Sequence, residues 1–300
     1  MTFLDNLSAS IHQKLLNKAT SEHRPFNELL QYYANERFLY RLGESVYKEQ
    51  FVLKGAFVFL AWQAPLTRPT KDIDFLGFTQ NSIGNLTEIV RNVCTQGVQP
   101  DGVIFDPDSV EGETINEADE YSGVRLKFLG YLGNARIHMQ LDIGFADRVT
   151  TSPGQLDNPT VLGESIKPNL RVYPPETVVA EKFQTMVALS LVNSRMKDFF
   201  DLWYMAKTMK FKSGLLQKAI KSTFDQRGTP LPKQVPTALT KEFAAQKQFQ
   251  WTAYIMKNQL GGVPQTFSDV IEDLRRFFEP IIFFDSKVVL QWNPIEGWQP

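Results

Sequence analysis

Two aspartates separated by one residue, Asp72 and Asp74, are the side chains whose type and spacing most plainly allow chemistry. They alternate with Ile73 and Phe75, which predicts a strand with both carboxylates on one face, about 6.5–7 Å apart along the chain. Two such carboxylates repel each other unless a cation lies between them, and hard oxygen ligands suit Mg²⁺ or Mn²⁺. Two metal ions about 3.5–4 Å apart stabilise both the attacking and the leaving oxygen of a phosphoryl displacement. The pair is also common on ordinary surface strands, so its meaning depends on its surroundings.

A third carboxylate, Asp142, lies in a segment with strict period-two alternation. Residues 136–145 alternate between apolar side chains and a polar set that includes Asp142. This pattern predicts a strand with one buried face and Asp142 on the other. A Gly133-Asn134 turn joins it to a second predicted strand over residues 124–132, as in a hairpin.

A glycine turn, Lys54-Gly55-Ala56, follows a short apolar run over residues 51–53 and precedes an apolar segment over residues 57–62. The spacing predicts the end of a strand or helix, a tight turn and one helix before the Asp-x-Asp pair. Backbone amides at such a turn and helix start can hold a triphosphate.

The remaining pattern predicts an α/β half followed by a helical half. Residues 1–50 show helical spacing interrupted at Pro25, residues 82–95 an amphipathic helix, and residues 170–173 a short strand. The acidic residues 100–120 are predicted to be mostly a solvated loop, with strand character around 103–105. Helical spacing after Pro174-Pro175 covers residues 176–191, 196–207, 215–224, 238–258 and 267–278. The composition shift near residue 175 therefore predicts domains over residues 1–174 and 175–300.

The bulk composition is that of a globular protein with a packed core. The chain has 300 residues, of which 43% are hydrophobic and 22% are charged, and a net charge of −1. A generic polyanion binder is usually basic, so binding of nucleic acid would need a local basic patch. The single cysteine, Cys94, excludes an intrachain disulfide and fits a buried structural thiol. No stretch reaches the roughly 18 apolar residues of a membrane span, so no membrane partner and a cytoplasmic location are expected.

Two blocks of sequence together resemble a known family. The first comprises Phe51–Ala56 and Arg68-Pro69-Thr70-Lys71-Asp72-Ile73-Asp74-Phe75, and the second Pro174–Lys182 with Arg195–Leu202. Over roughly residues 35–210 the chain resembles the AbiEii/AbiGii toxin nucleotidyltransferases of the polymerase-β-like superfamily. Arg68 and Thr70 match the family pattern, whereas Ala56 stands where a glycine or a serine is common, so no hydroxyl is offered there.

The resemblance implies a fold and a set of roles. The implied fold is a nucleotidyltransferase-type mixed sheet flanked by helices, followed by a helical C-terminal domain that completes the active site. Asp72, Asp74 and Asp142 are expected to bind Mg²⁺ or Mn²⁺, with Asp142 also as the base for the acceptor hydroxyl. Lys182 and Asp198 are expected to be catalytic as well. The expected nucleotide-binding residues are Lys54, Gly55, Ala56, Arg68, Thr70, Lys182 and Arg195.

The second block also has a simple physical interpretation. Arg195, Asp198 and Asp201 are spaced by three and share one helical stripe, and Lys182 lies on the preceding predicted helix. A lysine and an arginine facing a triphosphate would stabilise the leaving pyrophosphate. The alternative is an ordinary ladder of ion pairs within a helix, each worth about 0.2–0.5 kcal/mol.

The resemblance further implies the toxin of a toxin–antitoxin or phage-defence system, with a cognate antitoxin encoded nearby. Such an enzyme uses an NTP as substrate and releases pyrophosphate, and tRNA is the expected acceptor. Two alternatives stay open at this point. One is nucleotidylation of a partner or host protein, and the other is a non-catalytic module that binds nucleotide.

Overall fold

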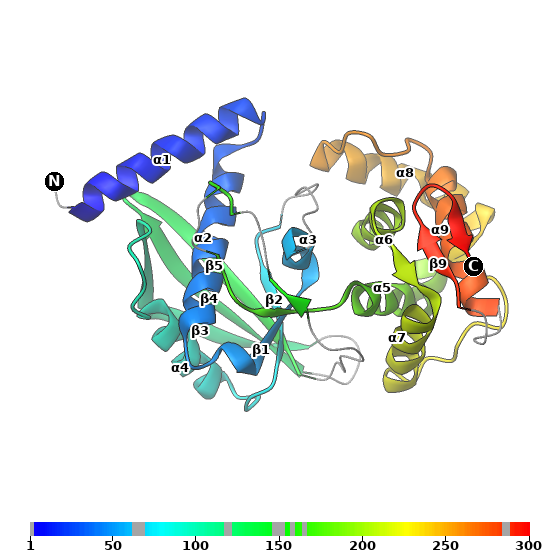
Figure 1. Ribbon diagram of the computed structural model, residues 1–300, viewed down its shortest axis with the longest axis horizontal. Coiled ribbons are helices and arrows are strands. Elements are labelled where there is room, and N and C mark those ends of the chain that lie inside the picture. The colour runs from blue at the N-terminus through cyan, green and yellow to red at the C-terminus, as the bar shows by residue number, and fades with distance from the viewer. Residues whose placement is uncertain are drawn as a thin grey trace. The chain divides into compact units, whose positions relative to one another are not determined.

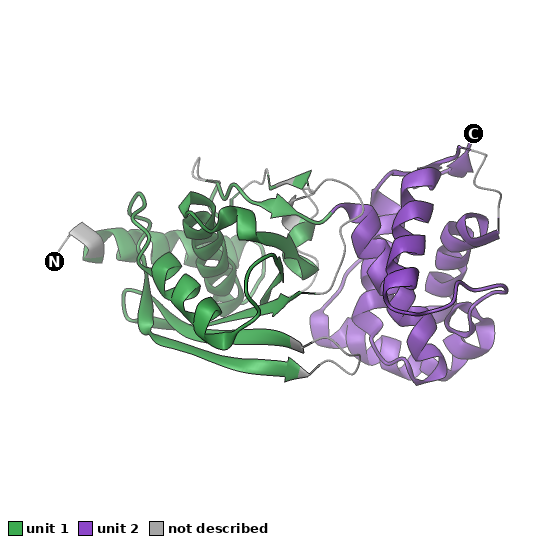
Figure 2. Ribbon diagram, turned by 90° about the horizontal axis from the view of Figure 1, so that it is seen from below, with its two compact units in different colours: residues 1–147, 153–173 green, residues 148–152, 174–300 purple. Residues whose placement is uncertain are grey.

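The computed structural model of the protein describes residues 3–61, 70–116, 122–145, 154–156, 160–163, 167–283 and 289–300. They belong to two compact units (Figure 1). Unit 1 comprises residues 1–147 and 153–173, and unit 2 comprises residues 148–152 and 174–300; Figure 2 colours the two units differently. The predicted α/β class with a mixed sheet, followed by a helical C-terminal half, is confirmed.

Unit 1 combines a mixed sheet with helices. Its described elements are α1 (Phe3–Ser21), α2 (Phe26–Glu44), η1 (Lys48–Gln50), β1 (Phe51–Lys54), η2 (Gly55–Phe57), α3 (Val58–Ala61), β2 (Ile73–Gly77), α4 (Ile83–Cys94), β3 (Val103–Asn116), β4 (Ser122–Leu132), β5 (Ala135–Gly144), β6 (Gly154–Gln155) and β7 (Arg171–Val172). Within the described residues the sheet has the order β3-β4-β5-β2-β1-β7-β6.

The central strands of this sheet bring distant parts of the chain together. β5 pairs with β2 in parallel, although about sixty residues separate them, and β2 pairs with β1 in antiparallel. The hairpin of β4 and β5 across Gly133, which has a φ of 57°, is as predicted. β2 thus lies between the strand that ends in the glycine turn and the strand that carries Asp142.

The predicted strand character around residues 103–105 is confirmed, but the described residues beyond it, up to 116, continue the strand and do not form the predicted loop. Strand β3 pairs along its length with β4. The register shifts between Asp106 and Glu111, so buried positions pass from Val103 and Phe105 to Val110. A bulge of this kind interrupts the period of two, and no single alternation therefore marks the strand in the sequence.

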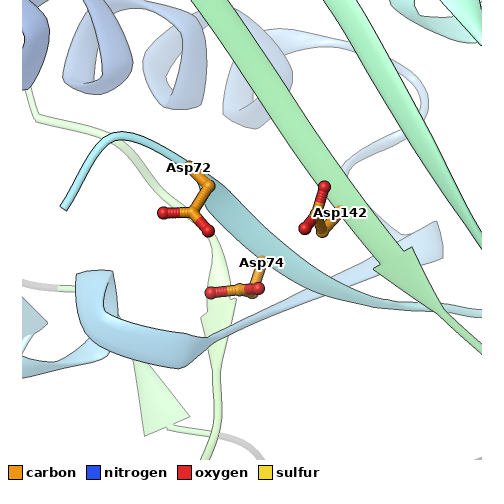
Figure 3. Close-up of side chains that lie close together, drawn as sticks. All are labelled: Asp72, Asp74 and Asp142. Atoms are coloured by element: carbon orange, nitrogen blue, oxygen red, sulfur yellow. The ribbon is translucent and has the colours of Figure 1, made fainter. Parts of the chain in front are cut away.

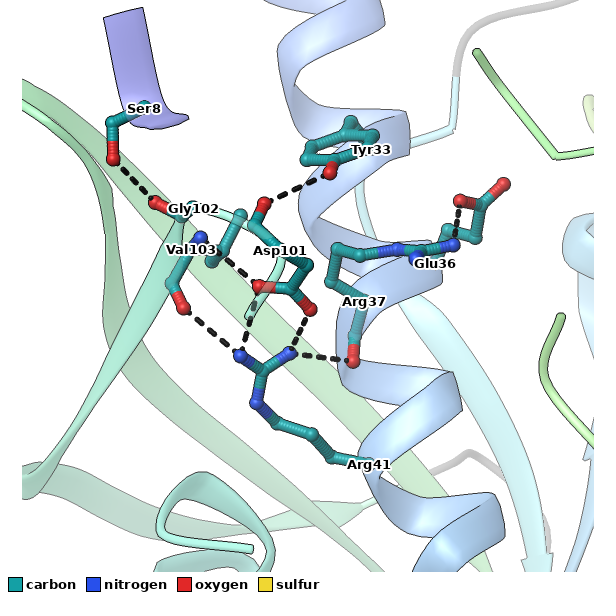
Figure 4. A network of polar contacts seen from close by, with 8 residues as sticks. All are labelled: Ser8, Tyr33, Glu36, Arg37, Arg41, Asp101, Gly102 and Val103. Atoms are coloured by element: carbon teal, nitrogen blue, oxygen red, sulfur yellow. Dashed lines mark hydrogen bonds and ion pairs between the residues drawn. The ribbon is translucent and has the colours of Figure 1, made fainter. Parts of the chain in front are cut away.

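Helix α2 packs on the sheet through an aromatic cluster and a buried ion pair. The Phe38 ring lies 5.7 Å from Phe105 and 5.2 Å from Phe128, measured between centroids. The guanidinium of Arg41 donates to both carboxylate oxygens of Asp101, at 2.7 and 3.0 Å, and to the carbonyl of Val103 at 2.9 Å (Figure 4). These bonds join α2 to the start of β3.

Helix α4 carries Cys94 at its end. The residue is 7% exposed, and burial raises the pKa of its thiol to about 12. Because a thiol with so high a pKa is almost entirely protonated near neutral pH, it is a poor nucleophile. The prediction of a buried structural thiol is confirmed.

Unit 2 is mostly helical. Its described elements are α5 (Pro175–Leu189), η3 (Ser190–Val192), α6 (Met196–Thr208), β8 (Phe211–Lys212), α7 (Ser213–Gln226), η4 (Thr237–Leu239), α8 (Lys241–Asn258), α9 (Phe267–Phe283), β9 (Gln291–Asn293) and β10 (Gly297–Gln299). The helices agree with those predicted. Their core is rich in phenylalanine, and the rings of Phe183 and Phe278 stack at 4.2 Å between centroids.

A small sheet of order β10-β9-β8 was missed from the sequence. Its strands have two or three residues, too few for a recognisable alternation. Two tryptophans fix it to the helices, since the indole N–H of Trp292 donates to the Ala206 carbonyl at 2.7 Å and that of Trp298 to the Phe277 carbonyl at 2.9 Å. Across the described part of the chain, none of the helices is both long and apolar enough to cross a membrane.

The Arg41–Asp101 pair should matter for stability. We expect Asp101→Ala to lower the free energy of unfolding by about 3–5 kcal/mol, because it leaves the Arg41 guanidinium buried without its counter-charge. Urea unfolding followed by circular dichroism measures this. Glu22→Ala is the control, since the Lys18–Glu22 pair is exposed and should contribute less than about 1 kcal/mol. Equal effects of the two substitutions would contradict the argument.

Candidate active site

Three predicted carboxylates meet at the centre of the unit 1 sheet. Asp72 directly precedes β2, Asp74 is its second residue, and Asp142 lies on β5. The parallel pairing of β2 with β5 places Asp74 opposite Asp142. One carboxylate oxygen from each of the three lies within 4.8 Å of the others, and all three residues are half-buried. Figure 3 shows the side chains gathered on one face of the two strands.

This donor set fits a divalent cation. Three carboxylates bring three negative charges together, and hard oxygen ligands are those that Mg²⁺ and Mn²⁺ prefer. Each carboxylate oxygen has two lone pairs, so Asp142 keeps ligand capacity even while it accepts hydrogen bonds. When bound, such an ion offsets charge on phosphate oxygens and polarises the bond that breaks. The carboxylates supply the ligands and fix their separation.

Gly55 makes room for this arrangement. Strand β1 pairs with β2 so that Lys54 lies opposite Asp74, and the next residue, Gly55, turns with a φ of 68°. A Cβ on Gly55 would lie 1.9 Å from Oδ2 of Asp74. Only glycine satisfies both the left-handed backbone and this close approach. The structure therefore brings Lys54 and Gly55 beside Asp74, and Ala56 follows them in η2.

Lys54 reaches across β2 toward β5. Its ammonium nitrogen lies 3.2 Å from the position that a Cβ would take on Gly144. Gly144 follows Asp142 by two residues and shares its face of the strand. Because Gly144 has no side chain, the Lys54 ammonium has space next to the carboxylates.

Two buried residues of α2 hold the chain where it enters β2. The Tyr32 hydroxyl accepts from the backbone N–H of Thr70 at 3.1 Å, and the Asn35 amide donates to the Lys71 carbonyl at 3.3 Å. Both side chains are 0% exposed. The Thr70 hydroxyl in turn donates to Oδ1 of Asp72 at 3.2 Å. Thr70, predicted to bind nucleotide, therefore contacts a predicted metal ligand.

Arg125 is a residue of this site that the sequence analysis missed. It lies opposite Asp142 in the β4–β5 hairpin, and its Nε and Nη2 donate to Oδ1 and Oδ2 of Asp142 at 2.8 and 2.7 Å. The hydrogen bond to Asp142 raises the pKa of Arg125. A signal was present in the sequence, because counting back from the two-residue turn at Gly133-Asn134 pairs residue 125 with residue 142.

The predicted residues of the second block meet within unit 2. The Lys182 ammonium on α5 lies 2.7 Å from Oδ1 of Asp198 and 2.9 Å from Oδ2 of Asp201. Arg195, at the start of α6, contacts Oδ2 of Asp198 at 2.6 Å. These contacts differ from a ladder of exposed pairs within one helix, because Lys182 bridges two helices and both aspartates are 2% exposed.

The electrostatics of Asp198 follow from this cluster. Burial alone raises the pKa of a carboxyl group, but the charges of Lys182 and Arg195 and their hydrogen bonds outweigh it and lower the pKa of Asp198 well below its usual range. The carboxylate is therefore ionised at neutral pH. Arg68, the remaining predicted site residue, lies outside the described residues.

The strand register sets three carboxylates beside a glycine turn. This arrangement is typical of proteins that transfer phosphoryl or nucleotidyl groups. The family model described as nucleotidyl transferase AbiEii toxin, type IV TA system, matches residues 37–273. The chain belongs to this family and is a nucleotidyltransferase of a toxin–antitoxin type.

The chain is also similar to two solved structures from Helicobacter pylori. One is that of JHP933, with 14% identity and a TM-score of 0.42, covering 79% of this chain and 84% of that one. The other is described as a proposed nucleotidyltransferase, with 15% identity and a TM-score of 0.44, covering 89% of this chain and 91% of that one. No curated protein sequence matches the chain.

The close approach of Gly55 to Asp74 can be tested by Gly55→Ala. We expect the new methyl group to displace the Asp74 carboxylate and lower nucleotidyl transfer by about 10²-fold or more, because ligands held 1 Å out of place cost rates of that order. Gly163→Ala is a matched control, since Gly163 has a φ of 71° and no atom of the described residues lies within 4 Å of its would-be Cβ. Both variants should lose about 1–2 kcal/mol of stability from the left-handed backbone, and only the first should lose activity.

A pH series can test the charge state of Asp198. Its folded pKa lies below the unfolded value of about 4, so its contribution to stability is complete above that value and is lost as the pH falls toward the folded one. We expect Asp198→Asn to cost about 3–5 kcal/mol at pH 7, and the difference from the unsubstituted protein to shrink below about pH 4. Urea unfolding at several pH values measures this difference.

The control for that series is Asp225→Asn, which removes an exposed carboxylate from α7 of the same unit. Its effect should stay within about 0.5 kcal/mol. A cost of Asp198→Asn that does not change with pH would show that the carboxylate contributes through packing alone.

Proposed function

We propose that this nucleotidyltransferase transfers a nucleoside monophosphate from an NTP to tRNA, using Mg²⁺ or Mn²⁺ held by Asp72, Asp74 and Asp142. The observation that supports the proposal most directly is the meeting of these three carboxylates beside the Gly55 turn. A carboxylate cluster next to a glycine turn matches the needs of a metal-bound triphosphate.

The proposed step is a displacement at the α-phosphorus. A hydroxyl oxygen of the acceptor forms a bond to the α-phosphorus, and the bond from that phosphorus to the pyrophosphate oxygen breaks. Asp142 is the proposed acceptor of the hydroxyl proton, through lone pairs that Arg125 does not use. Pyrophosphate leaves with the electron pair of the broken bond.

Several cationic and turn residues are proposed to hold the nucleotide. Lys54 lies beside the carboxylates and can offset the charge of a phosphate, and the turn at Gly55 and Ala56 can donate backbone N–H groups. Thr70 is proposed to orient Asp72. Arg68, which matches the family pattern, is proposed to bind the nucleotide.

We extend the proposal to Lys182, Arg195 and Asp198, because the matching family model spans both units. Lys182 and Arg195 are proposed to stabilise the leaving pyrophosphate. Asp198, which contacts both cations, is proposed to hold them in position. The C-terminal domain over residues 175–300 would then contribute directly to the transfer.

The distribution of charge supports a polyanionic acceptor. Residues 174–300 contain 16 Lys and Arg against 12 Asp and Glu, whereas residues 1–173 contain 16 against 21. Four lysines near α7, namely Lys210, Lys212, Lys218 and Lys221, are exposed. The near-neutral total thus conceals a net positive C-terminal half, which favours contact with a polyanion such as RNA.

The biological setting follows from the family. A type IV toxin–antitoxin family implies a cognate antitoxin, and we propose that it is encoded nearby and that the pair limits growth, including during phage infection. Because NTPs and tRNA are cytoplasmic, the reaction is proposed to take place in the cytoplasm.

A labelling experiment tests the reaction. The protein is incubated with Mg²⁺, total tRNA and each of the four NTPs, labelled at either the α- or the γ-phosphate. We expect label from the α-phosphate, and none from the γ-phosphate, to appear on tRNA in a denaturing gel. Asp74→Asn should lower the rate by about 10³-fold, equivalent to about 4 kcal/mol of barrier, because a metal ligand is lost.

Asp225→Asn serves as the control, since it removes an exposed carboxylate of unit 2 and should leave the rate unchanged. Transfer of γ-label would indicate phosphoryl rather than nucleotidyl transfer. A nucleotide adduct on a polypeptide, detected by mass spectrometry together with unmodified tRNA, would replace the acceptor in this proposal by a protein. Full activity of Asp74→Asn would refute its role as a metal ligand.

A further inference from the structure

A row of charged residues crosses the unit 1 sheet in register. Glu113 on β3 lies opposite Arg125 on β4, Arg125 opposite Asp142 on β5, and Asp142 opposite Asp74 on β2. Lys54 on β1 follows opposite Asp74. Charges of opposite sign are neighbours along this row except at Asp142 and Asp74, where two carboxylates meet.

Arg125 hydrogen-bonds to Asp142 from the side away from Asp74. Because β5 lies between β4 and β2 in the sheet, the two hydrogen bonds from Arg125 use lone pairs that face β4. Gln140 donates more weakly to the same two oxygens, at 3.2 and 3.4 Å. A carboxylate has about four lone-pair positions, so those directed toward Asp72 and Asp74 remain for a ligand.

The geometry of this pair is specific to arginine. A guanidinium and a carboxylate joined by two parallel bonds fix the orientation of the carboxylate plane, which a lysine cannot do. The side chains are 31% and 17% exposed, so water screens part of the attraction and limits what the pair adds to stability. The hairpin already holds β4 to β5 along its length through its backbone. Orientation of Asp142 is therefore what the pair contributes.

Lys127 provides a natural comparison. It lies two residues from Arg125 on the same strand, and its ammonium contacts Oε1 of Glu113 at 2.7 Å. Arg125 approaches the same oxygen at 4.0 Å. Lys127 therefore shares the strand, the charge and the partner Glu113 with Arg125, but among the described residues its ammonium bonds to Glu113 and not to Asp142.

We propose that Arg125 is a positioning residue, which locks the Asp142 carboxylate in the orientation that lets it share a divalent cation with Asp72 and Asp74. This inference rests on the metal site of the proposed function. Two effects of Arg125 on the cation oppose each other. Its positive charge repels the ion, whereas its two hydrogen bonds orient Asp142 as a ligand. Loss of such an orienting partner typically weakens metal binding by about 10–100-fold.

Arg125→Lys separates these effects, because it keeps the charge and removes the paired bonds. We expect it to weaken binding of Mn²⁺, measured without nucleotide from the signal of free Mn²⁺ in electron paramagnetic resonance, by about 10–100-fold. Lys127→Arg and Lys127→Gln, the matched controls, should leave the affinity nearly unchanged. The thermal unfolding midpoint without metal should be the same for all variants within a few degrees, because these pairs are partly exposed.

A double-mutant cycle makes the test specific to Asp142. If Arg125 acts through that carboxylate, Arg125→Lys should weaken Mn²⁺ binding no further in the Asp142→Asn background. Equal or tighter binding of Mn²⁺ by Arg125→Lys, or an additive loss in that background, would overturn the inference.

The transfer assay on the unsubstituted protein is read separately. If Mn²⁺ binds and Arg125→Lys weakens it, but no NTP labels an acceptor, the proposed function fails while the positioning role stands. If transfer occurs and Arg125→Lys binds Mn²⁺ normally, the positioning role fails while the function stands. If the unsubstituted protein binds no Mn²⁺, the positioning role is overturned directly.

Discussion

The structure of unit 1 depends on a contact between like charges that the sheet itself imposes. Backbone pairing of β2 with β5 sets Asp74 opposite Asp142, and the ligand oxygens of Asp72, Asp74 and Asp142 lie within 4.8 Å of one another. At an effective dielectric constant of about 20, two full charges at that distance repel by roughly 3–4 kcal/mol. The strands cannot slide to relieve this repulsion, because a shift of one residue would turn their apolar side chains out of the core. A cation is the simplest way to make the contact favourable.

The neighbouring residues are understandable as consequences of that contact. Lys54 and Arg125 flank the two carboxylates, one from each side of the row. Gly55 and Gly144 leave out side chains where the Asp74 carboxylate and the Lys54 ammonium need the space. Tyr32 and Asn35 of α2 hold the backbone before Asp72 from the opposite face of the sheet. The acidic centre therefore depends on the flanking Lys54 and Arg125 and on the space that Gly55 and Gly144 leave.

The sequence allowed much of this to be predicted, for physical reasons that differ between elements. The Asp-x-Asp strand, the hairpin and the long helices carry strong local periodicity, and their positions agree with the structure. Only the first residues of β3, 103–105, were predicted as strand, because the bulge after Asp106 interrupts the alternation and the acidic residues that follow resemble a loop. The contacts of Tyr32 and Asn35 join α2 to residues more than thirty positions away, and no local pattern encodes such contacts. The position of Arg125 opposite Asp142 could have been predicted, since the turn of a two-residue hairpin fixes the register of its strands.

Unit 2 also brings two carboxylates close together, but there the side chains of a lysine and an arginine neutralise them. Lys182, Asp198 and Asp201 form a buried ion cluster with Arg195, in which two cations face two anions. Taking such charges out of water costs several kcal/mol per ion, and apolar residues of similar volume often stabilise a helix pair equally well. Stability alone is thus a poor reason for the cluster, and the proposed role of Lys182 in the transfer would give another. The Lys182 side chain is 16% exposed while both aspartates are nearly inaccessible. The anions are therefore fixed inside the unit, and the cation that they orient keeps access to the surface, which the proposed contact of Lys182 with a phosphate requires.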